Sequence, residues 1–292
     1  MQMKEQQPPL SVQEQIRNLQ NNGLIVNNPT YAETVLTNIS YFRLIKAYSL
    51  GLKPKNGNYF PNVTFEQIVS LYEFNASFRQ NLFPVIEQIE ITLRCRLANF
   101  FSTRYGVLGY KNAENFQKPE YHRMLMADIQ AEENHNANAP FVKNFKQNYK
   151  NGDIPMYAIV ELFTFGTLSK FFKNMKNKDK KEVASSYGVG YTYFESWIES
   201  IAYVRNICAH YGRLYNAKIA KRPMQYQQYI SAETECGRIY DVLPCMGKLV
   251  AKKETWVQFV HSMQEAVSKF PYVQVKTMGF PADWAARLLT IF

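Results

Sequence analysis

The sequence has few of the side chains that bind transition metals, and it spreads them along the chain. Four cysteines occur in 292 residues, and no two of them have the Cys-x-x-Cys spacing of a zinc site. The four histidines are equally scattered, so no metal site is predicted. Isolated cysteines are typical of proteins kept in the reducing cytosol. The residues concerned are Cys95, Cys208, Cys236 and Cys245, and His122, His135, His210 and His261.

Long hydrophobic runs are also missing. No stretch reaches the roughly 18 apolar residues that cross a membrane, and residues 1–9 are polar, without the apolar segment of a secretory signal. Alternating strand patterns are almost absent, and we find no internal repeat and no clear linker. These absences predict a soluble cytoplasmic protein, not associated with a membrane, with a single all-α domain.

Acidic residues are outnumbered, 24 against 34 lysines and arginines, which gives a net charge of +10. Hydrophobic residues make up 46% of the chain and include 20 Tyr and 20 Phe, a composition typical of a globular protein. The positive charge favours a polyanionic partner, first a nucleic acid and second an acidic membrane surface. The same charge is common in proteins that bind neither, so the net charge alone does not identify the partner.

Apolar residues recur at helical spacing over most of the chain. A capping box at Ser11 and Glu14 starts the first helix, which Gly23 ends. Pro84 lies inside the longest pattern and is expected to kink or divide it. Residues 109–151 are expected to form short helices and loops. Further helices are expected at residues 29–39, from 40 onwards, at 64–101, after 155, at 193–211 and at 255–267, with a loop at 53–58.

The most chemically informative passage is residues 205–216. It places Arg205, Asn206, His210, Arg213 and Asn216 in an otherwise aliphatic and aromatic helical stretch. A guanidinium is a permanent cation whose donor fork fits phosphate, and an imidazole gives or takes a proton near neutral pH. Cleavage of RNA by its own 2′-hydroxyl requires this combination and needs no metal. The same residues can instead complement the dipole and bond the last carbonyls of a helix.

The spacing within this passage limits what one copy of the chain can do. On an ideal helix Arg205 and His210 lie about 140° apart, whereas Asn206, His210 and Arg213 fall on one stripe. Such a shallow, one-sided array cannot enclose a phosphodiester. Two copies related by a two-fold axis can, each supplying a histidine and one or two arginines. No second Arg-x4-His spacing occurs in the chain, so a composite site predicts a homodimer.

Two further groups are candidate RNA-binding or supporting residues. Glu90 and Arg94 have the spacing of a salt bridge on the long helix, and a carboxylate there can equally orient the motif helix. Lys170 and Lys173 open a lysine-rich run, residues 170–181, that forms either a solvated face or an RNA groove. The neighbouring aromatic residues are assigned to the core; they are Phe163, Phe165, Phe171 and Phe172.

Five ordered blocks of the sequence resemble the Abi-like (AbiD/AbiF) abortive-infection proteins. The passage 205–216 is similar to their R-N-x-C-A-H-x-x-R-[LI]-[WY]-N signature. The resemblance covers nearly the whole chain, because the blocks occur in the family's order. The other four are Ser40-Tyr41-Phe42-Arg43-Leu44, Ile89-Glu90-x-x-x-Arg94, the segment from Pro155 to Ser169, and Met278-Gly279-Phe280-Pro281-x-x-Trp284.

The resemblance implies an all-α, HEPN-type helical bundle, with residues 1–60 as an N-terminal helical arm, 61–217 as the core and 218–292 as a C-terminal helical cap. It implies a metal-independent endoribonuclease without a cofactor, whose site is built across a dimer. Arg205 and His210 take the catalytic positions, and Asn206 takes the polar position after the arginine. It also implies a toxin of anti-phage defence that is restrained until infection, in some relatives by a structured non-coding RNA.

Three functions stay open at this point. The first is RNA cleavage in which His210 moves a proton and Arg205 offsets charge on the phosphorane, leaving 2′,3′-cyclic phosphate and 5′-hydroxyl ends. The second is a non-catalytic module that holds a structured RNA. The third is a protein-interaction component whose positive charge is incidental. Binding that weakens as salt rises favours either RNA function over the third.

Overall fold

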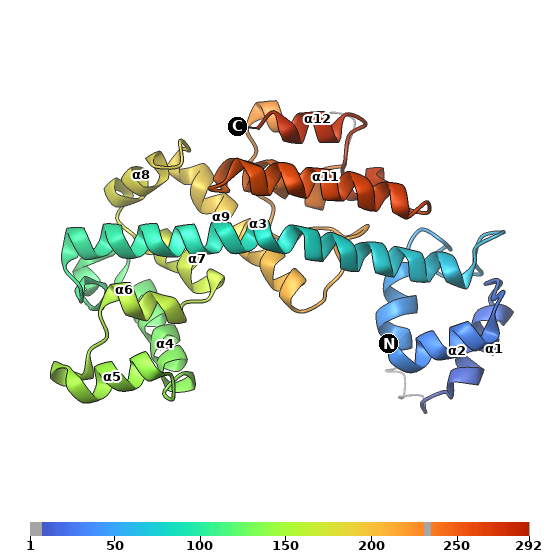
Figure 1. The fold of residues 1–292 in the computed structure, drawn as a ribbon, viewed down its shortest axis with the longest axis horizontal. Helices are drawn as coiled ribbons and strands as arrows, with labels where there is room; N and C mark the ends of the chain where they lie inside the picture. The colour runs from blue at the N-terminus through green and yellow to red at the C-terminus, as the bar shows by residue number, and fades with distance from the viewer. Residues whose placement is uncertain (1–7, 231–234, 292) are drawn as a thin grey trace, which may run out of the picture. The chain divides into compact units, whose positions relative to one another are not determined.

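The computed structural model describes residues 8–230 and 235–291. The chain divides into two compact units, and each is described by itself: unit 1 contains residues 1–78 and 264–275, and unit 2 contains residues 79–263 and 276–292. Two helices visible in Figure 1, α3 (Phe65–Tyr105) and α11 (Lys253–Lys269), contribute residues to both units. The described ranges contain isolated bridges but no β-strand, so the all-α prediction is confirmed.

Unit 1 begins with two helices that pack on each other, α1 (Val12–Asn21) and α2 (Pro29–Asn38). The predicted capping box is present. The Glu14 N–H donates to Ser11 Oγ at 3.2 Å, and the Glu14 carboxylate accepts from the Ser11 N–H at 2.7 Å. These two bonds satisfy donors that the start of a helix otherwise leaves open.

The third predicted piece of unit 1 is a π-helix, η1 (Phe42–Lys46), a rare geometry that is frequent at functional sites. The predicted loop over residues 53–58 follows it and is confirmed. Ser49 and Tyr59 join the two ends of this segment, because their hydroxyl oxygens lie 2.7 Å apart and both residues are buried.

Helix α3 continues through Pro84 as one helix of 41 residues, so it is not divided there. Proline removes one backbone donor and leaves the Gln80 carbonyl without its helical partner. Both residues lie on the exposed side of α3, where water can bond that carbonyl. The helix therefore tolerates the proline.

The prediction for residues 109–151 is wrong in one respect. The segment contains α4 (Pro119–His135), a helix of 17 residues. Only three of its residues are buried, His122, Leu125 and Ile129, and this sparse apolar spacing hid the helix among polar residues. His122 is held inside by a contact of 2.9 Å between its Nε2 and the Tyr110 carbonyl oxygen.

The centre of unit 2 is the helix pair α7 (Phe165–Asn174) and α9 (Tyr191–Ala209). Phe101 of α3 meets Phe171 edge to face, with 4.9 Å between the ring centroids. The four phenylalanines that the sequence assigned to the core are all buried. The remaining helices are α5 (Pro140–Asn148), α6 (Met156–Ile159), α8 (Asn177–Ser185), α10 (Leu243–Leu249) and α12 (Trp284–Leu289).

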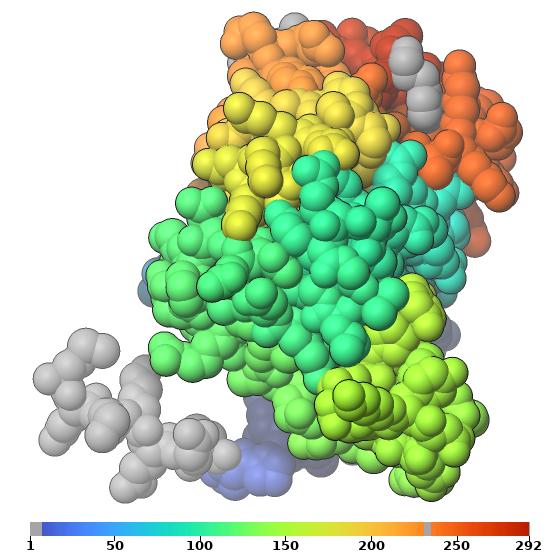
Figure 2. All heavy atoms as spheres, turned by 90° about the vertical axis from the view of Figure 1, so that its left-hand side faces the viewer, coloured from blue at the N-terminus to red at the C-terminus, as the bar shows by residue number. Residues whose placement is uncertain are grey.

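The C-terminal end of α3 is tied to α8. Figure 2 looks at this end of unit 2, where α8, in yellow, borders the last turns of α3, in teal. The Tyr105 hydroxyl donates to Asp179 at 2.6 Å, and the Arg104 guanidinium lies 3.9 Å from the same carboxylate and also pairs with Glu182. Burial and the bond to Asp179 raise the pKa of Tyr105 to about 12. One oxygen of the buried Asp179 carboxylate thus accepts a hydrogen bond, and the other has only the charge of Arg104 at 3.9 Å.

Two further sequence predictions concern the whole chain. In the ranges that the structure describes, no helix is both long and apolar enough to cross a membrane. All four cysteines are free thiols. Most of the polar N-terminal stretch, residues 1–7, lies outside the described residues. The cytoplasmic location and the division into arm, core and cap stay predictions.

Candidate functional site

The motif passage lies at the C-terminal end of α9, which a Schellman turn closes. The Tyr211 N–H donates to the Cys208 carbonyl at 3.2 Å, and the Gly212 N–H donates to the Ile207 carbonyl at 2.7 Å. The helix therefore ends at Ala209, two residues before the predicted end at Tyr211. The backbone itself bonds these last carbonyls.

The turn after His210 is fixed by its own backbone and from inside unit 2. Tyr211 has a φ of 56°, in the left-handed region that favours glycine. A Cβ on Gly212 would lie 2.8 Å from Ile207 Cγ2, so no other residue fits there without a shift. Arg79 of α3, which is buried, donates from Nη1 to the Gly212 carbonyl at 3.0 Å. This contact connects α3 directly to the motif.

Arg79 is a supporting residue that the sequence analysis missed. A signal for it exists, because helical spacing puts Arg79 in register with Leu82 and Ile86, which are buried core residues of α3. Charged residues are almost never buried unless they have a partner. An arginine on the apolar stripe of a long helix therefore indicates a buried hydrogen bond.

His210 and Asn206 present their side chains to solvent. His210 is the C-cap of α9, and its N–H donates to the Asn206 carbonyl at 3.0 Å. Within the described residues neither side chain has a hydrogen-bond partner, so the alternative in which they bond the last carbonyls is not found. A sequence-based expectation that the Asn206 side chain bonds and orients the His210 ring is therefore not met in the structure.

The predicted stripe through Asn206, His210 and Arg213 is wrong, because the helix ends before Arg213. Arg213 is half-buried in the segment that follows the turn. Asn216 closes the passage with a φ of 47°, and its Oδ1 accepts from Arg238 Nη1 at 3.3 Å. The passage thus contributes one exposed turn of helix and a folded segment, and not one continuous face.

Glu90 of α3 joins the motif helix to the rest of unit 2. Its Oε1 lies 3.0 Å from Arg94 Nη2, and its Oε2 lies 3.4 Å from Arg205 Nε. Arg94 also donates to the Glu161 carbonyl at 2.7 Å and to the Phe163 carbonyl at 2.9 Å. The two roles that the sequence left open for Glu90 are therefore both filled, one by each carboxylate oxygen.

Glu90, Arg94 and Arg205 line an open hollow of about 330 Å³ in unit 2, together with two further carboxylates, those of Glu87 and Glu161. Its apolar lining includes Phe83 and Ile91 of α3, both exposed, with Ile91 58% accessible. Arg205 is 30% exposed at the side chain, whereas the Glu90 side chain is only 13% exposed. The hollow therefore combines a guanidinium held by an ion pair with exposed apolar surface.

Lys170 and Lys173 are not brought to this hollow. Lys170 Nζ lies 2.7 Å from Asp128 Oδ2, and Lys173 Nζ lies 3.5 Å from Glu199 Oε2. Both ammonium groups thus face carboxylates of neighbouring helices. The lysine-rich run is closer to a solvated, ion-paired face than to an open RNA groove.

Cys208, inside the motif, is not a nucleophile at neutral pH. Burial raises the pKa of its thiol to about 12, although the positive charge of Arg79 acts in the opposite direction. Only the thiolate attacks, so a thiol with this pKa is inert.

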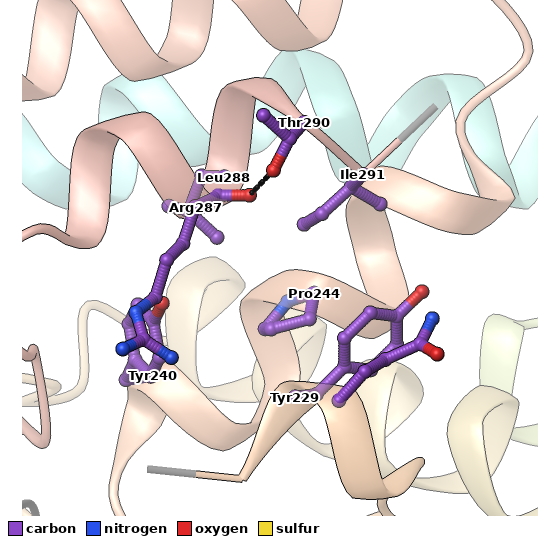
Figure 3. A pocket seen from close by; sticks show the side chains of 8 residues that line it. Tyr229, Tyr240, Pro244, Arg287, Leu288, Thr290 and Ile291 are labelled. Carbon is purple, nitrogen blue, oxygen red and sulfur yellow. Dashed lines mark hydrogen bonds between the residues drawn. The ribbon is translucent and has the colours of Figure 1, made fainter.

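Unit 2 holds another cavity, of about 240 Å³, that contains no residue of the motif. Figure 3 shows the Arg287 side chain extended toward Tyr240, and the Thr290 hydroxyl donating to the Arg287 carbonyl at 2.9 Å. Pro244 and Leu288 supply apolar walls. Arg287 Nε also pairs with Asp283 at 2.7 Å, so its charge is compensated within the fold.

The comparison with known families decides the identity of the chain. The sequence model of the family described as Abi-like protein matches residues 34–216, more than half of the chain. The chain therefore belongs to the Abi-like protein family. No curated protein and no solved structure matches it. The matched range contains Glu90 and Arg205 and ends at Asn216, the last residue of the motif passage.

Membership of the Abi-like family confirms the resemblance found in the sequence and suggests a role in abortive infection, a form of antiviral defence. The described residues of this Abi-like protein contain no group of three or more His, Cys, Asp or Glu side chains that could hold a metal ion.

Proposed function

We propose that this Abi-like protein is a HEPN-type endoribonuclease that acts as a toxin in abortive infection. The observation that carries the proposal is the arrangement at the end of α9. Arg205 is held by Glu90 at 3.4 Å, and five positions further along an exposed imidazole stands at a closed helix end. A positioned cation and a proton-transfer group are what RNA transesterification requires.

The contact with Glu90 leaves Arg205 able to bind phosphate. Glu90 meets the guanidinium at Nε, and no described residue accepts a hydrogen bond from Nη1 or Nη2. These two nitrogens can therefore form paired bonds to phosphate oxygens. The carboxylate restricts the side chain without occupying its terminal donors.

The proposed reaction needs no group besides the RNA and side chains. The 2′-oxygen attacks phosphorus as its proton passes to one imidazole, and the bond between phosphorus and the 5′-oxygen breaks as a second imidazole donates a proton. Arg205 offsets the negative charge on the phosphorane. The products carry a 2′,3′-cyclic phosphate and a 5′-hydroxyl. Because one chain supplies one His210, the second imidazole comes from a second copy.

An exposed strip on α3 with two large apolar side chains, Phe83 and Ile91, supports this homodimer. Phe83, Glu87, Ile91 and Cys95 follow one another at helical spacing and are all exposed. The hollow that contains Arg205 is lined by the same residues. A two-fold contact through this strip would cover Phe83 and Ile91 and bring the two hollows together. We expect analytical ultracentrifugation to detect a dimer for wild type and a monomer for Ile91→Asp. If both proteins sediment only as monomers, the composite site is contradicted.

The decisive experiment compares wild type with His210→Ala on end-labelled structured RNAs in the presence of EDTA. We expect cleavage by wild type that leaves cyclic phosphate ends, and none by His210→Ala with RNA affinity kept. His135→Ala is the matched control, because His135 is an exposed histidine in the last turn of α4, and it should cleave like wild type. Cleavage that leaves 5′-phosphates or requires Mg²⁺ would contradict the mechanism.

A second candidate is a non-catalytic module that holds a structured non-coding RNA. It is favoured by one observation: no described residue accepts or donates a hydrogen bond at the His210 ring, whereas general bases usually have an orienting partner. In that case His210→Ala would leave both RNA affinity and cellular toxicity unchanged. RNA that co-purifies with the protein without being cut would support this second function.

A further inference from the structure

Unit 1 holds an open hollow of about 490 Å³ that contains no residue of the motif. It lies between the π-helix η1 and the loop that follows. Tyr41 and Lys46 line it from the helical side, and Lys53 and Lys55 line it from the loop. Lys46 and Lys55 are exposed, and Lys53 is half-exposed with its Nζ 5.0 Å from the centre of the Tyr59 ring.

The charge of this hollow is positive and uncompensated. Residues 41–60 contain no aspartate or glutamate, and no described carboxylate lies within ion-pair distance of Lys46, Lys53 or Lys55. The lysines Lys170 and Lys173, by contrast, face carboxylates at 2.7 Å and 3.5 Å. A concave surface lined by one sign of charge concentrates the opposite charge. The hollow therefore fits a polyanion.

An exposed aromatic ring stands on the same helical turn. Phe42, the first residue of η1, is 79% exposed and lies four positions before Lys46. A phenylalanine with this exposure gives up most of the free energy that burial of its ring would supply. Aromatic rings beside a cationic groove are the recognition pattern of single-stranded nucleic acid, where unpaired bases stack on the ring.

We propose that this hollow binds single-stranded RNA, with backbone phosphates on Lys46, Lys53 and Lys55 and a base stacked on Phe42. A membrane surface fits less well, because interfacial segments present a flat amphipathic face and these lysines surround a concavity. The proposal rests on RNA as the ligand of the proposed function, but it does not require the motif at the end of α9 to cut.

The test measures binding and cleavage separately. A fluorescein-labelled single-stranded RNA of about 12 nucleotides spans a site of this kind. With 2′-O-methyl riboses it cannot be cleaved through the 2′-oxygen. Fluorescence anisotropy at several salt concentrations then compares wild type with Lys46→Gln/Lys53→Gln/Lys55→Gln. This variant removes three positive charges but keeps polar side chains at the three positions. We expect at least about tenfold weaker binding and a salt slope lower by about 2, since each phosphate contact on a single strand contributes about 0.7.

The matched control is Lys143→Gln/Lys150→Gln/Lys252→Gln. These three lysines of unit 2 are exposed and, among the described residues, have no ion-pair partner. Both triple variants lower the net charge of +10 by three, to +7, and we expect the control to bind like wild type. Equal weakening in both variants would mean that total charge, and not this hollow, attracts RNA, and the inference would be wrong.

Two further measurements separate the remaining outcomes. Phe42→Ala should weaken binding about fivefold or more without a change in salt slope, because stacking does not release counterions. If the hollow variant keeps RNA binding but loses binding to vesicles of phosphatidylcholine and phosphatidylserine, the occupant is a membrane and the proposal fails. If the hollow variant loses binding while the wild type fails to cleave unmodified RNA, the result would support RNA binding by the hollow and contradict the proposed ribonuclease activity.

Discussion

The Glu90 carboxylate lies 3.4 Å from the Arg205 guanidinium, although 115 positions separate the two residues in the chain. Glu90 is the less exposed partner, and its other oxygen pairs with Arg94 at 3.0 Å. Arg94 in turn bonds carbonyls of the segment before α7. The position of the motif arginine is thus set by a network that reaches across three parts of unit 2.

Glu90→Gln tests this network. The amide has the shape of the carboxylate but no charge, so Arg205 loses its ion pair, whereas Arg94 keeps Glu161 and two backbone carbonyls. Because Glu90 and Arg94 are mostly buried, we expect the free energy of unfolding to fall by about 2 kcal/mol and RNA cleavage to fall with it. Urea denaturation and a cleavage assay measure the two effects. Glu73→Gln is the control, because Glu73 is exposed on the same helix and lies outside the hollow; equal losses in both variants would mean that Glu90 has no special role.

Tyr211 should be under backbone strain, since a non-glycine residue in the left-handed region costs about 1–2 kcal/mol and its φ is 56°. Tyr211→Gly relieves the strain and removes the side chain, whereas Tyr211→Ala removes the side chain alone. We expect the glycine variant to unfold with a free energy about 1 kcal/mol higher than the alanine variant. Equal stabilities in thermal or urea unfolding would contradict the strained conformation.

This turn also explains why the end of α9 was misplaced from the sequence. A glycine normally takes the left-handed position just after a helix, so the pattern puts the end at Tyr211 with Gly212 beyond it. In the structure Tyr211 itself takes the left-handed position, and Gly212 follows it because Ile207 leaves no room for a Cβ. Local preference was overruled by the packing of one residue.

Several other features of the fold were predicted correctly because they depend on residues that are close together in the sequence. The capping box at Ser11 and the buried aromatic residues of α7 are fixed by short-range spacing, and both were predicted. The effect of Pro84 on the helix could not be predicted from the sequence alone, because it depends on which side of α3 is exposed to water.

The site divides in the same way. Arg205 and His210 were identified by residue type and spacing. That Glu90 reaches Arg205, and that Arg79 reaches the Gly212 carbonyl, depends on how closely α3 and α9 pack. Such distances between elements far apart in sequence are not contained in any local pattern. The sequence therefore offered Glu90 two roles and could not choose.

The four thiols should fall into two classes. Cys95 and Cys236 are exposed, whereas Cys208 and Cys245 are buried and burial raises the pKa of both thiols, that of Cys208 to about 12. Since the thiolate reacts, we expect Cys236 in the native dimer, and Cys95 as well in monomeric Ile91→Asp, to react quickly with Ellman's reagent at pH 8, and all four thiols to react after unfolding in urea. Mass spectrometry assigns the sites; rapid labelling of Cys208 in the native protein would contradict the packing around the motif.

The acid sensitivity of the fold should depend in part on Glu199 of α9. Its carboxylate accepts from Lys221 at 2.8 Å and lies 3.5 Å from Lys173. The hydrogen bond from Lys221 and the charge of Lys173 hold the pKa of Glu199 below its ordinary value of 4.5. A carboxyl whose pKa is lower in the folded state stabilises the protein above the unfolded pKa, and this contribution is lost as the pH falls through the folded pKa.

We therefore expect Glu199→Gln to lower the free energy of unfolding by about 0.5–1 kcal/mol at pH 7, because the group is partly exposed, and by progressively less below pH 4.5. Urea titrations of wild type and variant across this range measure the difference. Glu265→Gln, at an exposed position of α11 without an ion-pair partner among the described residues, should show none; a Glu199→Gln difference that stays constant down to acid pH would mean that the ion pairs are not its source.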